Sequence, residues 1–159
     1  MKNKFFIVGK NKIGYIGANF QTHFGEMEVK VPKKPELEAK TLKKSMTDQE
    51  ILKEFQPKEV TLGEFAWALK NEKKTLKNSY ANIFYIRDKN NILWAVCVGW
   101  SDFDRCWLVG ANSVDDPRRW DADRLDLYRL GEILDEKYLH TEAAKKKEAR
   151  DFPLKLLGK

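Results

Sequence analysis

The stretch GANSVDDPRRWDAD, residues 110–123, concentrates charged side chains directly after an apolar run. It holds four aspartates, two arginines and a tryptophan. Carboxylate oxygens are the ligands that Mg²⁺ or Mn²⁺ takes in phosphodiester-cleaving sites, so the stretch suggests a metal-dependent nuclease. The aspartates of this candidate metal site are Asp115, Asp116, Asp121 and Asp123, with Asp102 and Asp104 in a preceding turn.

The same aspartates also have structural explanations. Asp102 and Asp104 flank a predicted hairpin turn, where Asp is favoured for its local hydrogen bonds. Asp116 followed by Pro117 is typical of a helix start, with a capping residue before a proline at the first helical position. No histidine or lysine lies nearby to act as a base. We therefore expect no metal and no cofactor, and keep a small metal-dependent phosphodiesterase or nuclease as the alternative function.

Two consecutive arginines, Arg118 and Arg119, are the predicted partner-binding groups of this corner. On a turn of helix they would project about 100° apart, and the planar guanidinium fork matches a carboxylate or a phosphate. The alternative is that they pair with the neighbouring aspartates and brace the loop. A second predicted basic contact is the run Lys145, Lys146 and Lys147.

Nucleophilic catalysis finds little support. His23 and His140 are the only two histidines, and neither adjoins a nucleophile motif. Cys97 and Cys106 lie inside apolar runs without a C-x-x-C spacing, so we expect two small buried hydrophobes rather than a zinc site or a disulfide. The sequence offers no convincing enzyme.

Two glycines near the start of the chain have part of the spacing of a phosphate-binding loop. Gly9 and Gly14 have the spacing of its first part, but Tyr15 and Ile16 stand where the lysine and the hydroxyl are needed. We predict a hairpin with glycines at tight positions, inside β-structure that covers residues 4–31.

Three apolar segments predict an antiparallel meander: NIFYIRD, NILWAVCVGWS and RCWLVGANSV. Two-residue turns at Lys89-Asn90 and at Asp102-Phe103 would place Trp94 opposite Tyr85 and Ala111. Both faces of the meander are apolar, so both need cover. The helices below are expected to cover one face, and the N-terminal strands or a C-terminal helix the other.

Aromatic side chains share one face in that register: Tyr85, Trp94, Trp100 and Trp107. A sheet face of aromatics is how several single-strand nucleic-acid binders stack bases. Valines and isoleucines fill the rest of this face, however, which favours core packing, with Trp94 and Val96 well buried. A base-stacking platform stays as the weaker interpretation.

Two helices are predicted from capping boxes with apolar staples. Thr47 and Glu50 form the first, and Thr61 and Glu64 the second. With the meander they predict one α+β domain over residues 1–159, an antiparallel β-meander packed by short helices. Residues 32–45 are expected to form a charged linker or exposed excursion, and residues 130–159 a C-terminal helical extension.

The charge balance is basic, with 30 Lys and Arg against 24 Asp and Glu and a formal net charge of +6. This permits attraction to nucleic acid or to an acidic protein. No apolar run is long enough for a signal peptide or a membrane span, so we expect a cytoplasmic protein without a membrane partner.

A longer pattern joins the corner to the strand before it. Trp107-x-Val109-x-Ala111-Asn112-Ser113-Val114, followed by Pro117-x-x-Trp120, resembles small uncharacterised proteins of phages and mobile elements that share an A-N-S-V-x-x-P-x-x-W corner. The resemblance covers roughly residues 82–129 and implies a structural corner in which Trp120 packs back on the sheet. It implies no known activity.

These observations predict a non-enzymatic interaction protein of phage or mobile-element type. Its basic surface would bind a host protein or nucleic acid, and blocking a host defence system would be one such role.

Overall fold

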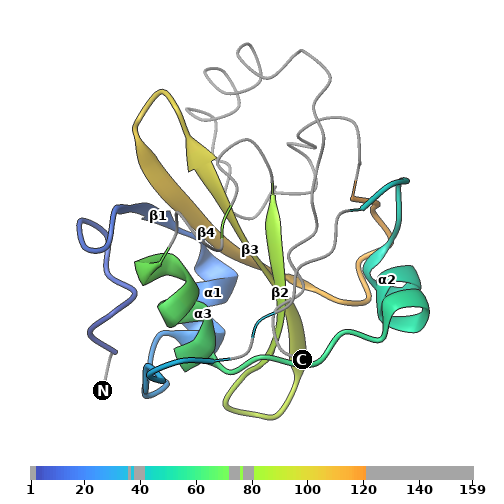
Figure 1. Cartoon of the computed structure of the whole chain (residues 1–159), viewed down its shortest axis with the longest axis horizontal. Helices are drawn as coiled ribbons and strands as arrows, with labels where there is room; N and C mark the ends of the chain where they lie inside the picture. Colours follow the sequence, from blue (N-terminus) through green and yellow to red (C-terminus); the bar gives the residue numbers. More distant parts are fainter. Residues whose placement is uncertain (1–2, 36, 38–41, 72–75, 77–80, 121–159) are drawn as a thin grey trace.

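Residues 3–35, 37, 42–71, 76 and 81–120 are described by the computed structural model of the chain (Figure 1). In chain order their elements are β1 (Ile13–Ile16), α1 (Ala18–Phe24), α2 (Asp48–Phe55), α3 (Leu62–Lys70), β2 (Asn82–Arg87), β3 (Leu93–Ser101) and β4 (Cys106–Ser113). The predicted α+β domain is confirmed. The strands form one sheet in the order β1-β4-β3-β2, in which β1 runs parallel to β4 and the other pairs are antiparallel. The sheet is therefore mixed, and the predicted meander accounts for three of its four strands.

The N-terminal segment differs most from the prediction. Of the β-structure expected over residues 4–31, only Ile13–Ile16 is a strand. Gly9, Asn11 and Lys12 have positive φ angles of 95°, 54° and 61°, so the chain turns tightly before β1. The next residues form α1 because Phe20 and Phe24, four positions apart, bury one helical stripe.

The turn between β2 and β3 changes the predicted register. Arg87 pairs with Leu93, so the loop contains Asp88 to Ile92 rather than two turn residues. Trp94 consequently lies opposite Ile86, not Tyr85, and every β2 side chain takes the other face.

The turn between β3 and β4 is also longer than predicted. It contains residues 102–105, and Trp100 pairs with Trp107. Trp94 therefore lies opposite Ser113 instead of Ala111. Because the shift is by two residues, the faces of β3 and β4 stay as predicted.

Helices cover the two faces of the sheet separately (Figure 1). Helices α1 and α3 pack on one face, and α2 packs on the other, so the two capped helices do not share a face as expected. Val96 and Val98 are fully buried under α1 and α3, whereas Trp94 is only half-buried. The sheet residues of that face are Ile13, Ile16, Phe84, Ile86, Trp94, Val96, Val98, Trp100, Trp107, Val109 and Ala111. Those of the α2 face are Tyr15, Ile83, Tyr85, Leu93, Ala95, Cys97, Cys106 and Leu108.

Both capping boxes are present. The Thr47 and Thr61 hydroxyls each accept a hydrogen bond of 3.1 Å from the backbone N–H of Glu50 and Glu64, whose carboxylates accept in return. Helix α2 ends at Phe55, and the capping residue Gln56 adopts a φ of 46° directly before Pro57.

Two predicted features lie outside the described residues: the helical extension 130–159, and within it the run Lys145, Lys146 and Lys147. None of the helices in the described ranges has the length and apolar character needed to cross a membrane.

Candidate functional site

The corner after β4 is shaped by short hydrogen bonds between its own residues. Ser113 accepts from two backbone N–H groups, that of Asp115 at its hydroxyl (3.2 Å) and that of Asp116 at its carbonyl (3.1 Å). Asp116 Oδ1 in turn accepts from the backbone N–H of Arg118 at 2.9 Å. This Asx-turn replaces the predicted helix start, and no helical turn follows Pro117.

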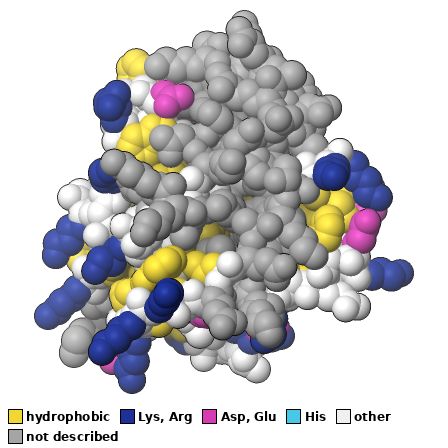
Figure 2. All heavy atoms as spheres, in the orientation of Figure 1, with side chains coloured by type: hydrophobic (Ala, Val, Ile, Leu, Met, Phe, Trp, Pro, Cys, Tyr) yellow, Lys and Arg dark blue, Asp and Glu magenta, His cyan; other side chains and the backbone are white. Residues whose placement is uncertain are grey.

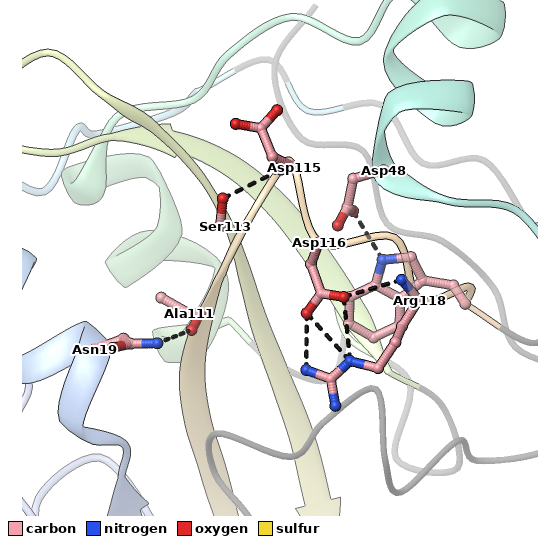
Figure 3. A network of polar contacts seen from close by, with 8 residues as sticks. Asn19, Asp48, Ala111, Ser113, Asp115, Asp116 and Arg118 are labelled. Carbon is pink, nitrogen blue, oxygen red and sulfur yellow. Dashed lines mark hydrogen bonds and ion pairs between the residues drawn. The ribbon is translucent and has the colours of Figure 1, made fainter.

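Both corner arginines are engaged in ion pairs. Arg118 Nη2 lies 2.7 Å from Asp116 Oδ2, one of the pairings that sequence reasoning anticipated (Figure 3). Arg119 instead reaches α2, with Nη1 2.8 Å from Glu50 Oε1 and 2.9 Å from the carbonyl oxygen of Ser45. The Arg119 contact with Glu50 braces the corner against α2, whereas the Arg118 pair lies within the corner. A role of either arginine in binding a partner stays a prediction.

The pKa values of both acceptor carboxyls lie below the ordinary values of these groups. The hydrogen bond from the Arg118 side chain lowers the pKa of Asp116, with burial opposing it in part. For Glu50, the backbone N–H of Thr47 lowers the pKa most, burial opposes it, and Arg119 lowers it further. The two carboxyl groups are therefore ionised partners for the arginines at neutral pH.

Beneath the corner lies a buried polar hub formed by Asp48, Tyr85 and Trp120. The Tyr85 hydroxyl and the Trp120 indole N–H both donate to Asp48 Oδ1, each at 2.8 Å. Trp120 also forms an antiparallel bridge with Met46, with N–H···O distances of 3.0 and 2.7 Å. Trp120 is 3% exposed and belongs to the core cluster on the α2 face of the sheet. Burial raises the pKa of Tyr85, which keeps the phenol protonated as a donor.

The aspartates of the candidate metal site do not converge where the structure describes them. In Figure 3 the Asp115 side chain points away from that of Asp116, and Asp115 Oδ1 accepts from Gln49 Nε2 at 2.9 Å. Among the described residues, no group of three His, Cys, Asp or Glu side chains is placed to hold a metal ion. Asp121 and Asp123 lie outside those residues.

A histidine–aspartate pair that sequence reasoning missed joins α1 to the β2–β3 loop. His23 Nδ1 lies 3.4 Å from Asp88 Oδ2, and its ring contacts that of Trp94 in a tilted arrangement, with 4.3 Å between centroids. Trp94 Nε1 donates to Asp88 Oδ2 at 2.9 Å, while Asp88 Oδ1 accepts from the backbone N–H groups of Asn90 and Ile92. Burial by itself raises the pKa of Asp88, but these hydrogen bonds and His23 hold it below its usual range. The pair links α1 to the β2–β3 loop. Because its two residues are 65 positions apart, no pattern in the sequence indicates it.

The aromatic residues and cysteines contribute mainly to the core. Trp94, Trp100 and Trp107 share the face under α1 and α3, but Tyr85 lies on the opposite face because of the register shift. Trp107 is fully buried and meets Trp100 edge-on at 5.0 Å, so these rings do not form an open platform together. The expected burial of Cys97 and Cys106 is confirmed, and the two do not form a disulfide.

The charge of the described residues is unevenly distributed along the chain. Residues 3–35 contain six lysines and two glutamates, whereas residues 42–71 and 81–120 each contain five basic and five acidic side chains. All six of those lysines are exposed. We call them the lysine surface: Lys4, Lys10, Lys12, Lys30, Lys33 and Lys34. Figure 2 shows Lys and Arg side chains around exposed hydrophobic ones on the side where the N-terminal segment lies in Figure 1.

A surface pocket opens within this part of the molecule, between the chain start and the segment after α1. Its volume is about 670 Å³, within the range of ligand-binding sites. We call it the N-terminal groove; its lining residues are Asn3, Lys4, Phe5, Glu26, Met27, Glu28, Val29 and Val31.

Comparison of the chain with protein-family models, with curated proteins and with solved structures found no match. The functional assignment therefore depends on the charge distribution and the geometry described above.

Proposed function

We propose that this chain is a non-enzymatic interaction protein of phage or mobile-element type that binds an anionic surface of a host macromolecule. The lysine surface is the contact region. The supporting observation is that the positive excess of the described residues comes entirely from residues 3–35, while the remaining described ranges are balanced.

The corner is a weaker candidate for the contact region. Arg118 and Arg119 are exposed, but each already lies within 2.8 Å of a carboxylate oxygen of the same chain. A partner would have to displace Asp116 or Glu50 before either guanidinium became available. The lysine surface has only Glu26 and Glu28 as acidic neighbours in its own segment, so it attracts anions over a longer range.

The class of partner determines how binding depends on salt. With a nucleic acid, affinity falls as salt rises, and each lysine–phosphate contact makes the slope of log affinity against log salt concentration more negative by about 0.7–0.9. With an acidic protein, rim lysines chiefly accelerate association, and the salt dependence is weaker. Blocking a host defence protein is one role that fits the second case.

A pull-down from a bacterial lysate, with and without nuclease treatment, tests the proposal. We expect a captured partner whose retention falls as salt is raised. Loss of capture after nuclease treatment identifies nucleic acid, and capture that survives it identifies a protein. Capture that is insensitive to salt would contradict the proposal, as would hydrolysis of a nucleic acid by the purified chain.

A further inference from the structure

The N-terminal groove has two walls, each fixed to the body of the domain. Asn3 joins them at one end: its backbone N–H donates to the carbonyl of Gly25 at 2.9 Å, and its side-chain amide donates to the carbonyl of Phe24 at 3.2 Å. At the other end Lys30 rests on α3, where Gly63 lacks the Cβ that would collide with the Lys30 carbonyl oxygen. The groove is therefore preformed, and no rearrangement is needed to open it.

The second wall, residues 26–31 with the sequence EMEVKV, has the side-chain alternation of a strand without a partner strand. Glu26, Glu28 and Lys30 are exposed, while Met27 and Val29 are half-buried against the core. Among the described residues, no hydrogen bond uses the backbone N–H or C=O groups of residues 28–31. A row of unpaired backbone groups beside apolar side chains is a template on which an extended chain adds as a strand.

The charges of the groove discriminate between classes of occupant. Its lining carries Lys4 against Glu26 and Glu28, so a phosphate backbone lying in the groove would be repelled by two carboxylates. Lys30 and, beyond Val31, Lys33 and Lys34 stand outside the lining. This arrangement attracts an acidic molecule to the rim but favours apolar side chains and peptide groups inside.

From these observations we propose that the N-terminal groove binds an extended segment of an acidic partner protein. The segment pairs its backbone with Val29 and Val31, since the Lys30 carbonyl lies against Gly63 of α3, and it places alternate apolar side chains against Phe5, Val29 and Val31. This inference rests on the proposed function, since the lysine surface attracts the partner, and it adds that the partner is a protein held by strand addition.

Selection from a displayed library of random twelve-residue peptides tests the inference on the full chain. We expect enriched peptides in which apolar residues alternate with polar ones, with Asp and Glu concentrated at the end of the peptide nearest Lys30, Lys33 and Lys34 and not beside Glu26 and Glu28. A synthetic peptide of that sequence should lose at least about tenfold in affinity when alternate backbone amides are N-methylated, because the pairing hydrogen bonds are removed. It should lose a similar factor against Val31→Asn.

Val8→Asn is the matched control, because Val8 is an exposed valine of the same segment outside the groove, 58% exposed against 38% for Val31. It should bind the peptide as the unmodified chain does. Three results would overturn the inference: no enrichment, enrichment without alternation, or equal binding to both valine variants. Binding of a thymidine oligonucleotide that Val31→Asn weakens would also overturn it, in favour of nucleic acid.

Failure here is distinguishable from failure of the proposed function. If the salt-sensitive partner from the lysate is retained by Val31→Asn but lost when lysines of the lysine surface are replaced, the proposed function stands and the docking inference is wrong.

Discussion

Replacing Tyr85 with Phe should destabilise the domain by about 1–3 kcal/mol, although the aromatic ring stays in place. The hydroxyl donates at 2.8 Å to Asp48 Oδ1, and the two residues are 1% and 0% exposed. Its removal leaves a buried carboxyl oxygen with one donor fewer, and the cost of under-satisfying such an acceptor sets the magnitude. The hydrophobic term changes little because only one oxygen atom is lost.

Urea unfolding followed by tryptophan fluorescence measures this change, with an unchanged slope on denaturant showing that the two states remain the same. Trp120→Phe removes the second donor to the same oxygen, so the two substitutions together should depart from additivity by at least about 0.5 kcal/mol. A change below about 0.5 kcal/mol for Tyr85→Phe, or strict additivity in the cycle, would refute the hub as a stabilising element.

Three further predictions concern the corner, the β2–β3 loop and α3. Replacing Arg118 and Arg119 together with Gln should lower the melting temperature by only a few degrees, because both arginine side chains are about half exposed to solvent, and leave partner capture unchanged; lost capture at full stability would make them binding residues. Asp88 has a folded-state pKa below its ordinary value of 3.8, so its contribution should be present above that pH and disappear as pH falls through the folded-state pKa. Asp88→Asn should therefore flatten the acid limb of a stability–pH curve, and an unaltered limb would contradict the assignment. Gly63→Ala should destabilise by about 1–3 kcal/mol despite the better helix propensity of alanine, because the added methyl meets the Lys30 carbonyl; stabilisation in a urea melt would contradict that packing.

Features encoded locally were predictable from the sequence. The capping boxes at Thr47 and Thr61 need only residues three apart, and both helices begin where predicted. The meander followed from apolar runs separated by turn residues. The register of the meander was not predictable. Asp88 accepts hydrogen bonds from two backbone N–H groups of its own loop, and the loop is therefore longer than the two-residue turn that the sequence suggests.

Features that depend on contacts distant in sequence were not predictable. The run FFIVGKNKIGYI reads as a hairpin, but β1 pairs with β4, some 90 positions away, and leaves FFIVG to form turns. In the sequence, Asp48 has only the character of an acidic residue in the first turn of a helix. Its hydrogen bonds from Tyr85 and Trp120 depend on the tertiary fold. At the candidate site, the lysine runs were visible in the sequence. The excess of lysine over residues 3–35 could also be counted there, whereas the exposure of all six lysines depends on how the segment folds.

The proposed role of the lysine surface is tested most directly by two charge-matched variants. One replaces Lys10, Lys12, Lys33 and Lys34 with Gln, leaving the groove lining intact. The other makes the same change at four exposed lysines of the balanced ranges, Lys43, Lys53, Lys58 and Lys89. Both lose the same net charge, so a difference in partner capture at fixed salt reports the location of the charge. We predict at least a tenfold loss of capture for the first variant and near-normal capture for the second. Equal capture by the two variants would contradict the assignment of the binding surface to residues 3–35.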